Sequence, residues 1–193
     1  MKALVNPFEI YSEKKLLWTG IALALVTALI SSATSHLIFG SLKVINNYQQ
    51  TWYVAMLNIG ITLLFNTAVL FVFGRFRNPK TRVIDVLNVV LIAHIVVYLM
   101  LYLTALPFVQ DALIAVELEV LAKGFEAPEL SKMHMFILAF FGMLVILLII
   151  YFFYFLVVGM KIAMNSKRKV DVFIIIILVF VLNTILQVIN PFF

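Results

Sequence analysis

The stretch MFILAFFGMLVILLIIYFFYFLVV, residues 135–158, decides the class of this protein. It carries no charged residue and is longer than the ~20 helical residues that cross the hydrocarbon core of a bilayer. Lipid offers the backbone no hydrogen-bond partners, so such a run must be helical. Phenylalanine, leucine, isoleucine and valine leave it almost no polar stripe, and we expect this helix to contact more lipid than the others.

The composition of the whole chain points the same way. Of 193 residues, 65% are hydrophobic and 12% are charged, whereas a soluble domain has about half apolar and about a quarter charged residues. A globule of this length cannot bury so much apolar surface. The chain has no cysteine, which excludes disulfides, thiolate metal sites and cysteine nucleophiles.

Four further apolar runs are long enough to span a membrane. They cover about residues 16–39, 52–73, 84–106 and 172–189. The prediction is an all-α polytopic membrane protein, residues 1–193 forming a single membrane domain with five transmembrane helices. A cleaved signal peptide is the alternative for the first run, because Ser31-Ser32-Ala33-Thr34-Ser35 has the small residues of a cleavage site. Its apolar run is long for a signal peptide, and Glu9 and Glu13 precede it.

The basic residues predict the orientation. Those before the first run and in the second and fourth loops are Lys2, Lys14, Lys15, Arg75, Arg77, Lys80, Arg82, Lys161, Lys167, Arg168 and Lys169. The other side has only Lys43, Lys123 and Lys132. The positive-inside rule therefore predicts a multi-pass protein of the cytoplasmic (inner) membrane, with the N-terminus cytoplasmic and the C-terminus outside. The net charge of +5 follows from this arrangement, and no nucleic-acid partner is expected.

Two segments outside the spans are predicted to be helical. Asn6-Pro7-Phe8-Glu9 is typical of a helix start, with Asn6 as the cap and Pro7 in the first turn. This inner amphipathic helix would anchor the chain at the membrane interface through Phe8, Tyr11, Lys14 and Lys15; a docking site for a cytoplasmic partner is the alternative. In the long third loop, residues 111–123 form an outer helix that stops at Gly124.

Polar residues inside the spans mark either packing seams or a site. The candidates are Asn58, Asn66, Asp85, Asn88, His94, Asn183 and Gln187. Asp85 is most simply a favourable charge at a helix N-terminus beside cations. With Asn88 and His94 it could instead form a proton or cation path.

The sequence carries no enzymatic motif. Gly-x-Ser-x-Gly, His-Glu-x-x-His and a phosphate loop are all missing. His36, His94 and His134 fall in separate segments, so a shared metal ion is not expected. The prediction is a protein that is not an enzyme and needs no cofactor.

The opening Asn6-Pro7-Phe8-Glu9, the pair Lys14-Lys15, the five spans and the stretch KTRVIDVLNVVLIAH at 80–94 resemble the bacterial branch of the Yip family (Ypt-interacting proteins). The resemblance implies a non-catalytic membrane scaffold or interaction protein, linked to membrane organisation or trafficking. Expected partners are membrane lipids and another membrane protein or a second copy of the chain. A small transporter or channel component with a polar intramembrane path is the alternative function.

Overall fold

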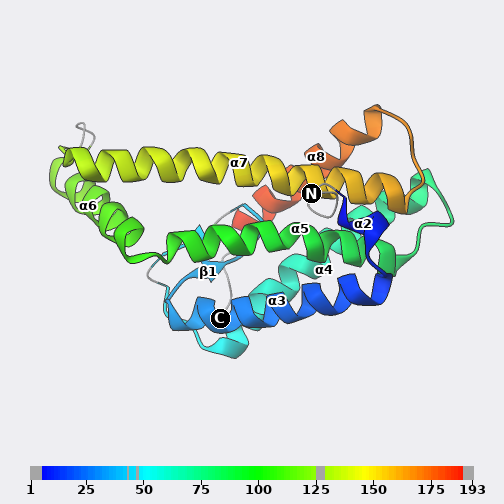
Figure 1. Cartoon of the computed structure of the whole chain (residues 1–193), viewed down its shortest axis with the longest axis horizontal. Coiled ribbons are helices and arrows are strands. Elements are labelled where there is room, and N and C mark those ends of the chain that lie inside the picture. Colours follow the sequence, from blue (N-terminus) through cyan, green and yellow to red (C-terminus); the bar gives the residue numbers. More distant parts are fainter. Residues whose placement is uncertain (1–5, 43, 47, 125–128, 189–193) are drawn as a thin grey trace.

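The computed structural model describes residues 6–42, 44–46, 48–124 and 129–188. Over these ranges the chain forms seven helices and one two-stranded hairpin (Figure 1). In chain order the elements are α2 (Pro7–Ile10), α3 (Glu13–Ala33), β1 (Leu37–Ile38), β2 (Val44–Ile45), α4 (Trp52–Arg77), α5 (Val83–Thr104), α6 (Pro107–Lys123), α7 (Lys132–Ala163) and α8 (Val170–Val188).

Five of the helices, α3, α4, α5, α7 and α8, are long and apolar enough to cross a membrane. The prediction of an all-α polytopic membrane protein is confirmed. The last predicted span ended at residue 189, which lies outside the described residues. The longest helix is α7, whose 32 residues extend for ~48 Å at 1.5 Å per residue, well beyond the ~30 Å hydrocarbon core.

Helix α5 lies at the centre of the bundle, between α3, α4 and α7 (Figure 1). It is the most buried of the five candidate spans, and α7 is the least buried. Exposed side chains on α7 recur every three to four residues, among them Phe136, Phe140, Met143 and Leu147. This lateral apolar surface agrees with the expectation that the fourth span contacts the most lipid.

Two glycines let the neighbouring helices approach α5 closely. A Cβ on Gly20 of α3 would lie 2.6 Å from Cβ of Leu91, and one on Gly159 of α7 would lie 2.6 Å from Cγ2 of Val89. Membrane helices have no hydrophobic driving force to associate, so close backbone contact through small residues takes over that role.

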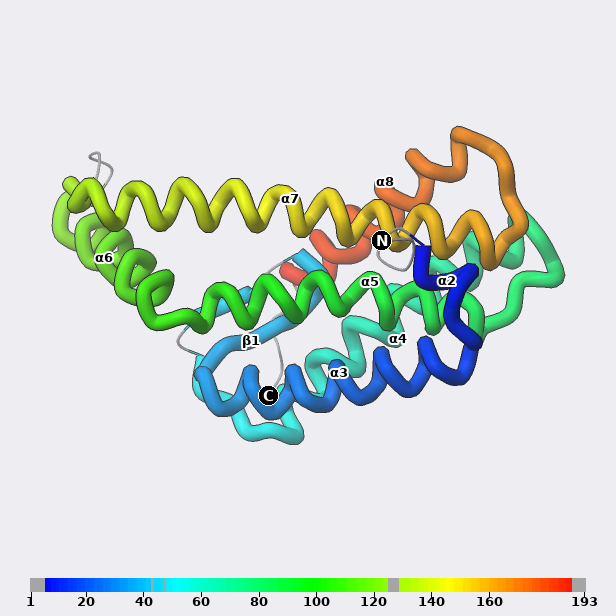
Figure 2. Tube along the Cα trace, viewed as in Figure 1, coloured from blue at the N-terminus to red at the C-terminus, as the bar shows by residue number. Residues whose placement is uncertain are grey.

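The first span departs from its prediction. The apolar run 16–39 was expected to be one helix, but α3 ends at Ala33 and Ser35 adopts a left-handed conformation with φ 54°. The chain then folds back as a hairpin in which Leu37 pairs with Ile45 and Ile38 pairs with Val44. Leu37 and Ile38 are 0% and 2% exposed, so the hairpin enters the bundle instead of lying on it (Figure 2). A buried strand and a membrane helix are both apolar, so hydropathy alone does not distinguish β1 from the end of α3.

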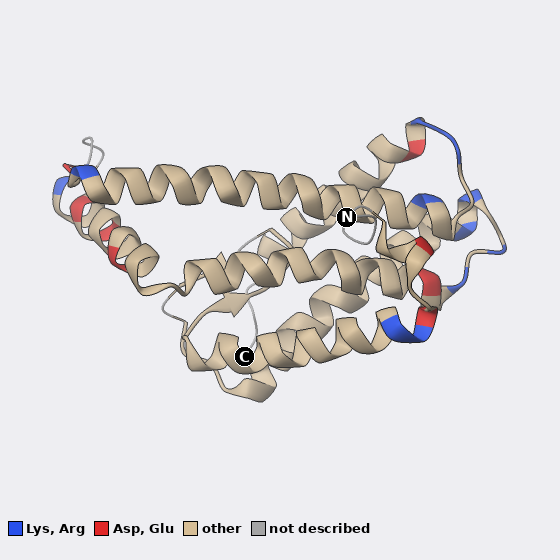
Figure 3. Cartoon of the chain, viewed as in Figure 1, with Lys and Arg blue, Asp and Glu red and all other residues tan. Residues whose placement is uncertain are grey.

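Charged residues gather at the two ends of the bundle (Figure 3). The start of α3 and the loops after α4 and α7 bring most of the lysines and arginines to one end, which we call the basic end. The opposite end, which we call the far end, carries the acidic helix α6 and the end of α3, where the chain enters the hairpin. Lys2 and Lys43, on which the orientation also drew, lie outside the described residues.

The two predicted helices outside the spans are present. Helix α6 contains the predicted residues 111–123 but begins earlier, at Pro107, and ends before Gly124, whose φ is 66°. Helix α2 is one turn long with Pro7 in its first turn. Asn6 occupies the predicted N-cap position, but its side chain makes no capping hydrogen bond.

Candidate functional site

The turn of the hairpin, at Gly40 and Ser41, lies among buried polar side chains from α4, α5 and α8. Its backbone is not helical, so its N–H groups need partners from elsewhere in the protein. The Gly40 amide donates to Oγ1 of Thr62 at 2.9 Å. The Ser41 amide donates to Oδ1 of Asn183 at 2.5 Å. Helices α4 and α8 thus each supply one side-chain acceptor to the turn.

The Ser41 side chain continues this network. Its Oγ lies 2.8 Å from Nε2 of His94, and Nδ1 of His94 lies 2.7 Å from the carbonyl oxygen of Val90. A carbonyl only accepts, so Nδ1 carries the proton and Nε2 accepts from the Ser41 hydroxyl. Asn66 donates to Ser41 Oγ at 3.3 Å and accepts from Asn183 Nδ2 at 3.4 Å. We call Ser41, Thr62, Asn66, His94 and Asn183 the polar core.

In many enzymes a serine nucleophile is hydrogen-bonded to a histidine base, and a second hydrogen bond orients the histidine ring. Ser41, His94 and the carbonyl of Val90 have this arrangement. Here Ser41 is 0% and His94 is 1% exposed, so water and substrate do not reach them in this conformation. The turn amides of Gly40 and Ser41, which could stabilise an oxyanion, already donate to Thr62 and Asn183. The geometry therefore serves to hold the hairpin.

A second network ties the hairpin to the far end. Nε2 of Gln50 donates to the carbonyl oxygen of His36 at 2.6 Å and to Oγ of Ser31 at 3.0 Å. Oε1 of Gln50 accepts from Asn58 at 3.3 Å. Gln110 of α6 joins through its Nε2, 2.9 Å from Nε2 of His36. These contacts fix the start and the end of the hairpin to α3, α4 and α6.

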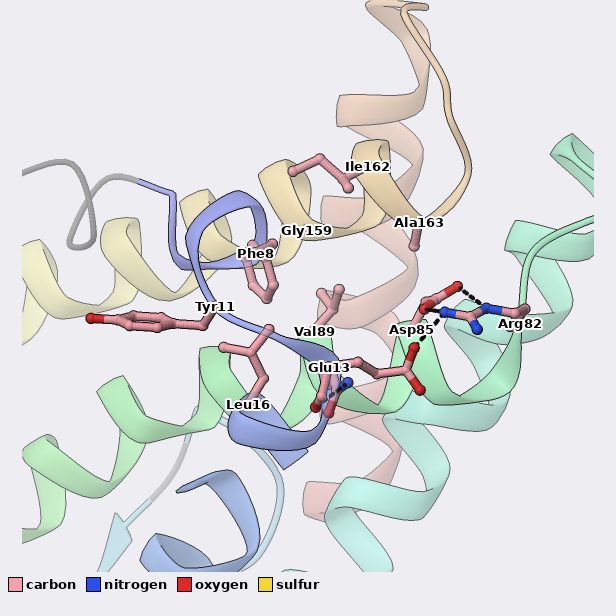
Figure 4. Close-up of a pocket in the computed structure, with 11 residues that line it drawn as sticks. Phe8, Tyr11, Glu13, Leu16, Arg82, Asp85, Val89, Gly159, Ile162 and Ala163 are labelled. Carbon is pink, nitrogen blue, oxygen red and sulfur yellow. Dashed lines mark hydrogen bonds and ion pairs between the residues drawn. The ribbon is translucent and has the colours of Figure 1, made fainter. Parts of the chain in front are cut away.

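The basic end holds a separate group of charges. Arg82 donates from Nε to Asp85 at 2.9 Å, and its Nη2 lies 2.5 Å from carboxylate oxygens of both Asp85 and Glu13 (Figure 4). These hydrogen bonds, those to Asp85 first, raise the pKa of Arg82 above its ordinary value. Asn88 donates to the carbonyl oxygen of Glu13 at 3.2 Å. The group borders a cavity of about 290 Å³ between α2, α3, α5 and α7.

The structure thus divides the predicted intramembrane candidates. It brings Asn66, His94 and Asn183 together in the polar core. Asn58 joins the far-end network, while Asp85 and Asn88 lie at the basic end. Gln187 is exposed on α8.

Sequence reasoning missed Ser41, Gln50 and Glu13. Ser41 follows Gly40 directly after the apolar span assigned to 16–39, and this Gly-Ser pair is a turn signal. Gln50 and Glu13 lie outside every predicted polar stripe.

The four residues of the predicted interface anchor, Phe8, Tyr11, Lys14 and Lys15, do not all lie at the surface. Phe8 packs edge-on against Phe155, with ring centroids 6.3 Å apart, and faces α7. Tyr11 is exposed, and Nζ of Lys15 lies 4.4 Å from the centre of its ring. Lys14 is exposed beside them. Phe8 therefore attaches α2 to the bundle, while Tyr11 and the two lysines remain at the surface.

Replacing Asn183 by leucine removes the acceptor of the Ser41 amide and the donor to Asn66. A buried N–H left without a partner costs ~1–3 kcal/mol. We expect the Asn183→Leu variant to unfold at a lower temperature in detergent, measured by circular dichroism. Thr184→Val on the same helix is the control, because the exposed Thr184 hydroxyl bonds only within α8, to the carbonyl of Phe180. Equal melting temperatures for the two variants would contradict a structural role for Asn183.

Comparison with known proteins leaves the family of the chain open. No family model matches the sequence, and neither a curated protein nor a solved structure matches it.

Proposed function

We propose that this chain is a non-catalytic scaffold or interaction protein of the cytoplasmic membrane, which acts through helix packing and lipid contact. One observation carries the proposal: the polar core is occupied in holding the hairpin. Three of its members, Ser41, Asn66 and Asn183, are 0% exposed, and each bonds to another member. The exposed apolar side of α7 and the charged basic end both offer surface for interaction.

The separation of Asp85 from His94 supports this choice over transport. The two residues are nine positions apart on α5, which is ~13 Å along the helix axis. Asn88 lies one turn beyond Asp85 and donates back to Glu13 at the basic end. Between Asn88 and His94 the α5 side chains are Val89, Val90, Leu91, Ile92 and Ala93, all buried and apolar. Helix α5 therefore supplies no hydrogen-bonding side chain for a proton path between Asn88 and His94.

The proposal includes the orientation of the chain in the membrane and its membership of the Yip family. The basic end would face the cytoplasm, as the positive-inside rule requires, and helix α2 would lie at the inner surface. Membership of the Yip family is supported by the five spans, the opening Asn6-Pro7-Phe8-Glu9, and the basic loop before α5. A role in membrane organisation follows from that kinship.

The orientation is tested with single cysteines, because the chain has none of its own. Glu117→Cys on α6 and Lys167→Cys in the loop after α7 replace exposed residues. In intact cells a membrane-impermeant maleimide should label the Glu117→Cys protein and should label the Lys167→Cys protein only after permeabilisation. The reverse pattern would place the N-terminus outside.

The absence of a transport path is tested in sealed vesicles containing the purified protein. We expect proton and potassium fluxes equal to those of protein-free vesicles, with an added ionophore showing that the vesicles are sealed. The Asp85→Asn variant should behave in the same way. A protein-dependent flux that falls in Asp85→Asn would overturn the scaffold proposal and favour transport.

A further inference from the structure

The cavity at the basic end contains an unused hydrogen-bond acceptor. Asn88 is 3% exposed and lines the cavity, and its Oδ1 is buried without a hydrogen-bond partner among the described residues. Its Nδ2 is already bonded to the Glu13 carbonyl. A buried acceptor without a partner is unfavourable, so a hydrogen-bond donor in the cavity would stabilise Asn88 once its side chain turned toward that donor.

The charges beside the cavity specify the ligand further. Glu13 and Asp85 contribute two negative charges and Arg82 one positive charge, which leaves one net negative charge. Figure 4 shows both carboxylates turned toward Arg82 at the rim of the cavity. A cationic group that also carries N–H donors would meet both requirements, with charge-assisted bonds to a carboxylate and a bond to Asn88.

An apolar groove adjoins this cavity. A second hollow of about 370 Å³ runs along α3, α5 and α7, and Tyr11 and Leu16 line both. Its α5 side extends from Ile92 to Leu99, ~10 Å along the helix axis. Its α7 side is formed by Tyr151 and Phe155. Apart from Lys15 and Thr19 on its α3 side, the groove is lined mainly by apolar and aromatic side chains, as an acyl chain requires.

We propose that the polar cavity and the apolar groove together bind one phospholipid with a primary ammonium headgroup, of the phosphatidylethanolamine type. The ammonium group lies against Asn88 Oδ1 and the carboxylate of Glu13 or Asp85, and an acyl chain follows the groove toward Leu99. This deepens the proposed function by naming the lipid that the chain contacts.

The same features discriminate between headgroups. A choline headgroup carries the positive charge but has no N–H to give to Asn88. A glycerol headgroup has hydroxyl donors but no positive charge to pair with the carboxylates of Glu13 and Asp85. Phosphatidylethanolamine has both the charge and the donors, so it should be preferred over the other two.

The test is native mass spectrometry of the purified, delipidated full chain, titrated in detergent with phosphatidylethanolamine, phosphatidylcholine or phosphatidylglycerol of identical acyl chains. We expect one phosphatidylethanolamine per chain to bind about tenfold more tightly than the other two. Equal retention of the three lipids would overturn the proposal. Soluble glycerophosphoethanolamine, which has no acyl chain, should bind far more weakly; binding as tight as that of the lipid would refute the role of the groove.

Matched variants locate the site. Glu13→Gln removes one negative charge at the cavity, and Glu9→Gln removes one from exposed α2 outside it. Glu13→Gln should lose most of the preference for phosphatidylethanolamine, and Glu9→Gln should keep it. Leu99→Trp fills the groove at an exposed position and should also weaken binding. Unchanged binding in Glu13→Gln would exclude this site, while the vesicle flux would still decide the proposed function separately.

Discussion

The structure depends on one requirement: the backbone of a non-helical turn buried in an apolar bundle must find hydrogen-bond partners. A helix satisfies its own amides, but the turn at Gly40 and Ser41 does not. Thr62 of α4 and Asn183 of α8 supply the missing acceptors. The side chains around them then satisfy one another, which explains why uncharged polar residues recur in spans that are otherwise apolar.

This requirement also determines how the helices are arranged. The hairpin turn hydrogen-bonds to α4, α5 and α8, and α4 also contacts α5 and α8 directly. Helix α5 supplies His94 to the turn and packs through Val89 and Leu91 against the glycines of α7 and α3. The far-end network around Gln50 closes the hairpin at its base. At the basic end the bundle opens into the cavity beside Glu13 and Asn88.

Much of this architecture could be predicted from the residues. Length and hydropathy identify five spanning helices, because lipid imposes a minimum length and forbids unpaired backbone. The first span was predicted too long, since Leu37 and Ile38 are as apolar as a lipid-facing helix. The sequence suggests that Asn66, His94 and Asn183 face one another. It does not show that Asp85 and Gln187 lie outside this group. Helical spacing predicts which face of its own helix a residue occupies. Which residue of another helix it contacts depends on how the helices pack. The partners Ser41, Gln50 and Glu13 come from segments whose path only tertiary packing determines.

The central claim is that the polar core holds the hairpin and lines no water-filled path. The most direct measurement is the rate at which a small water-soluble maleimide modifies Ser41→Cys, the one cysteine in an otherwise cysteine-free chain. If the core is closed, this thiol should react far more slowly in the folded protein than after unfolding in SDS, where a cysteine at exposed Lys167 gives the reference rate. Reaction in the folded protein at a rate close to that reference would show that water reaches Ser41, and would contradict the account.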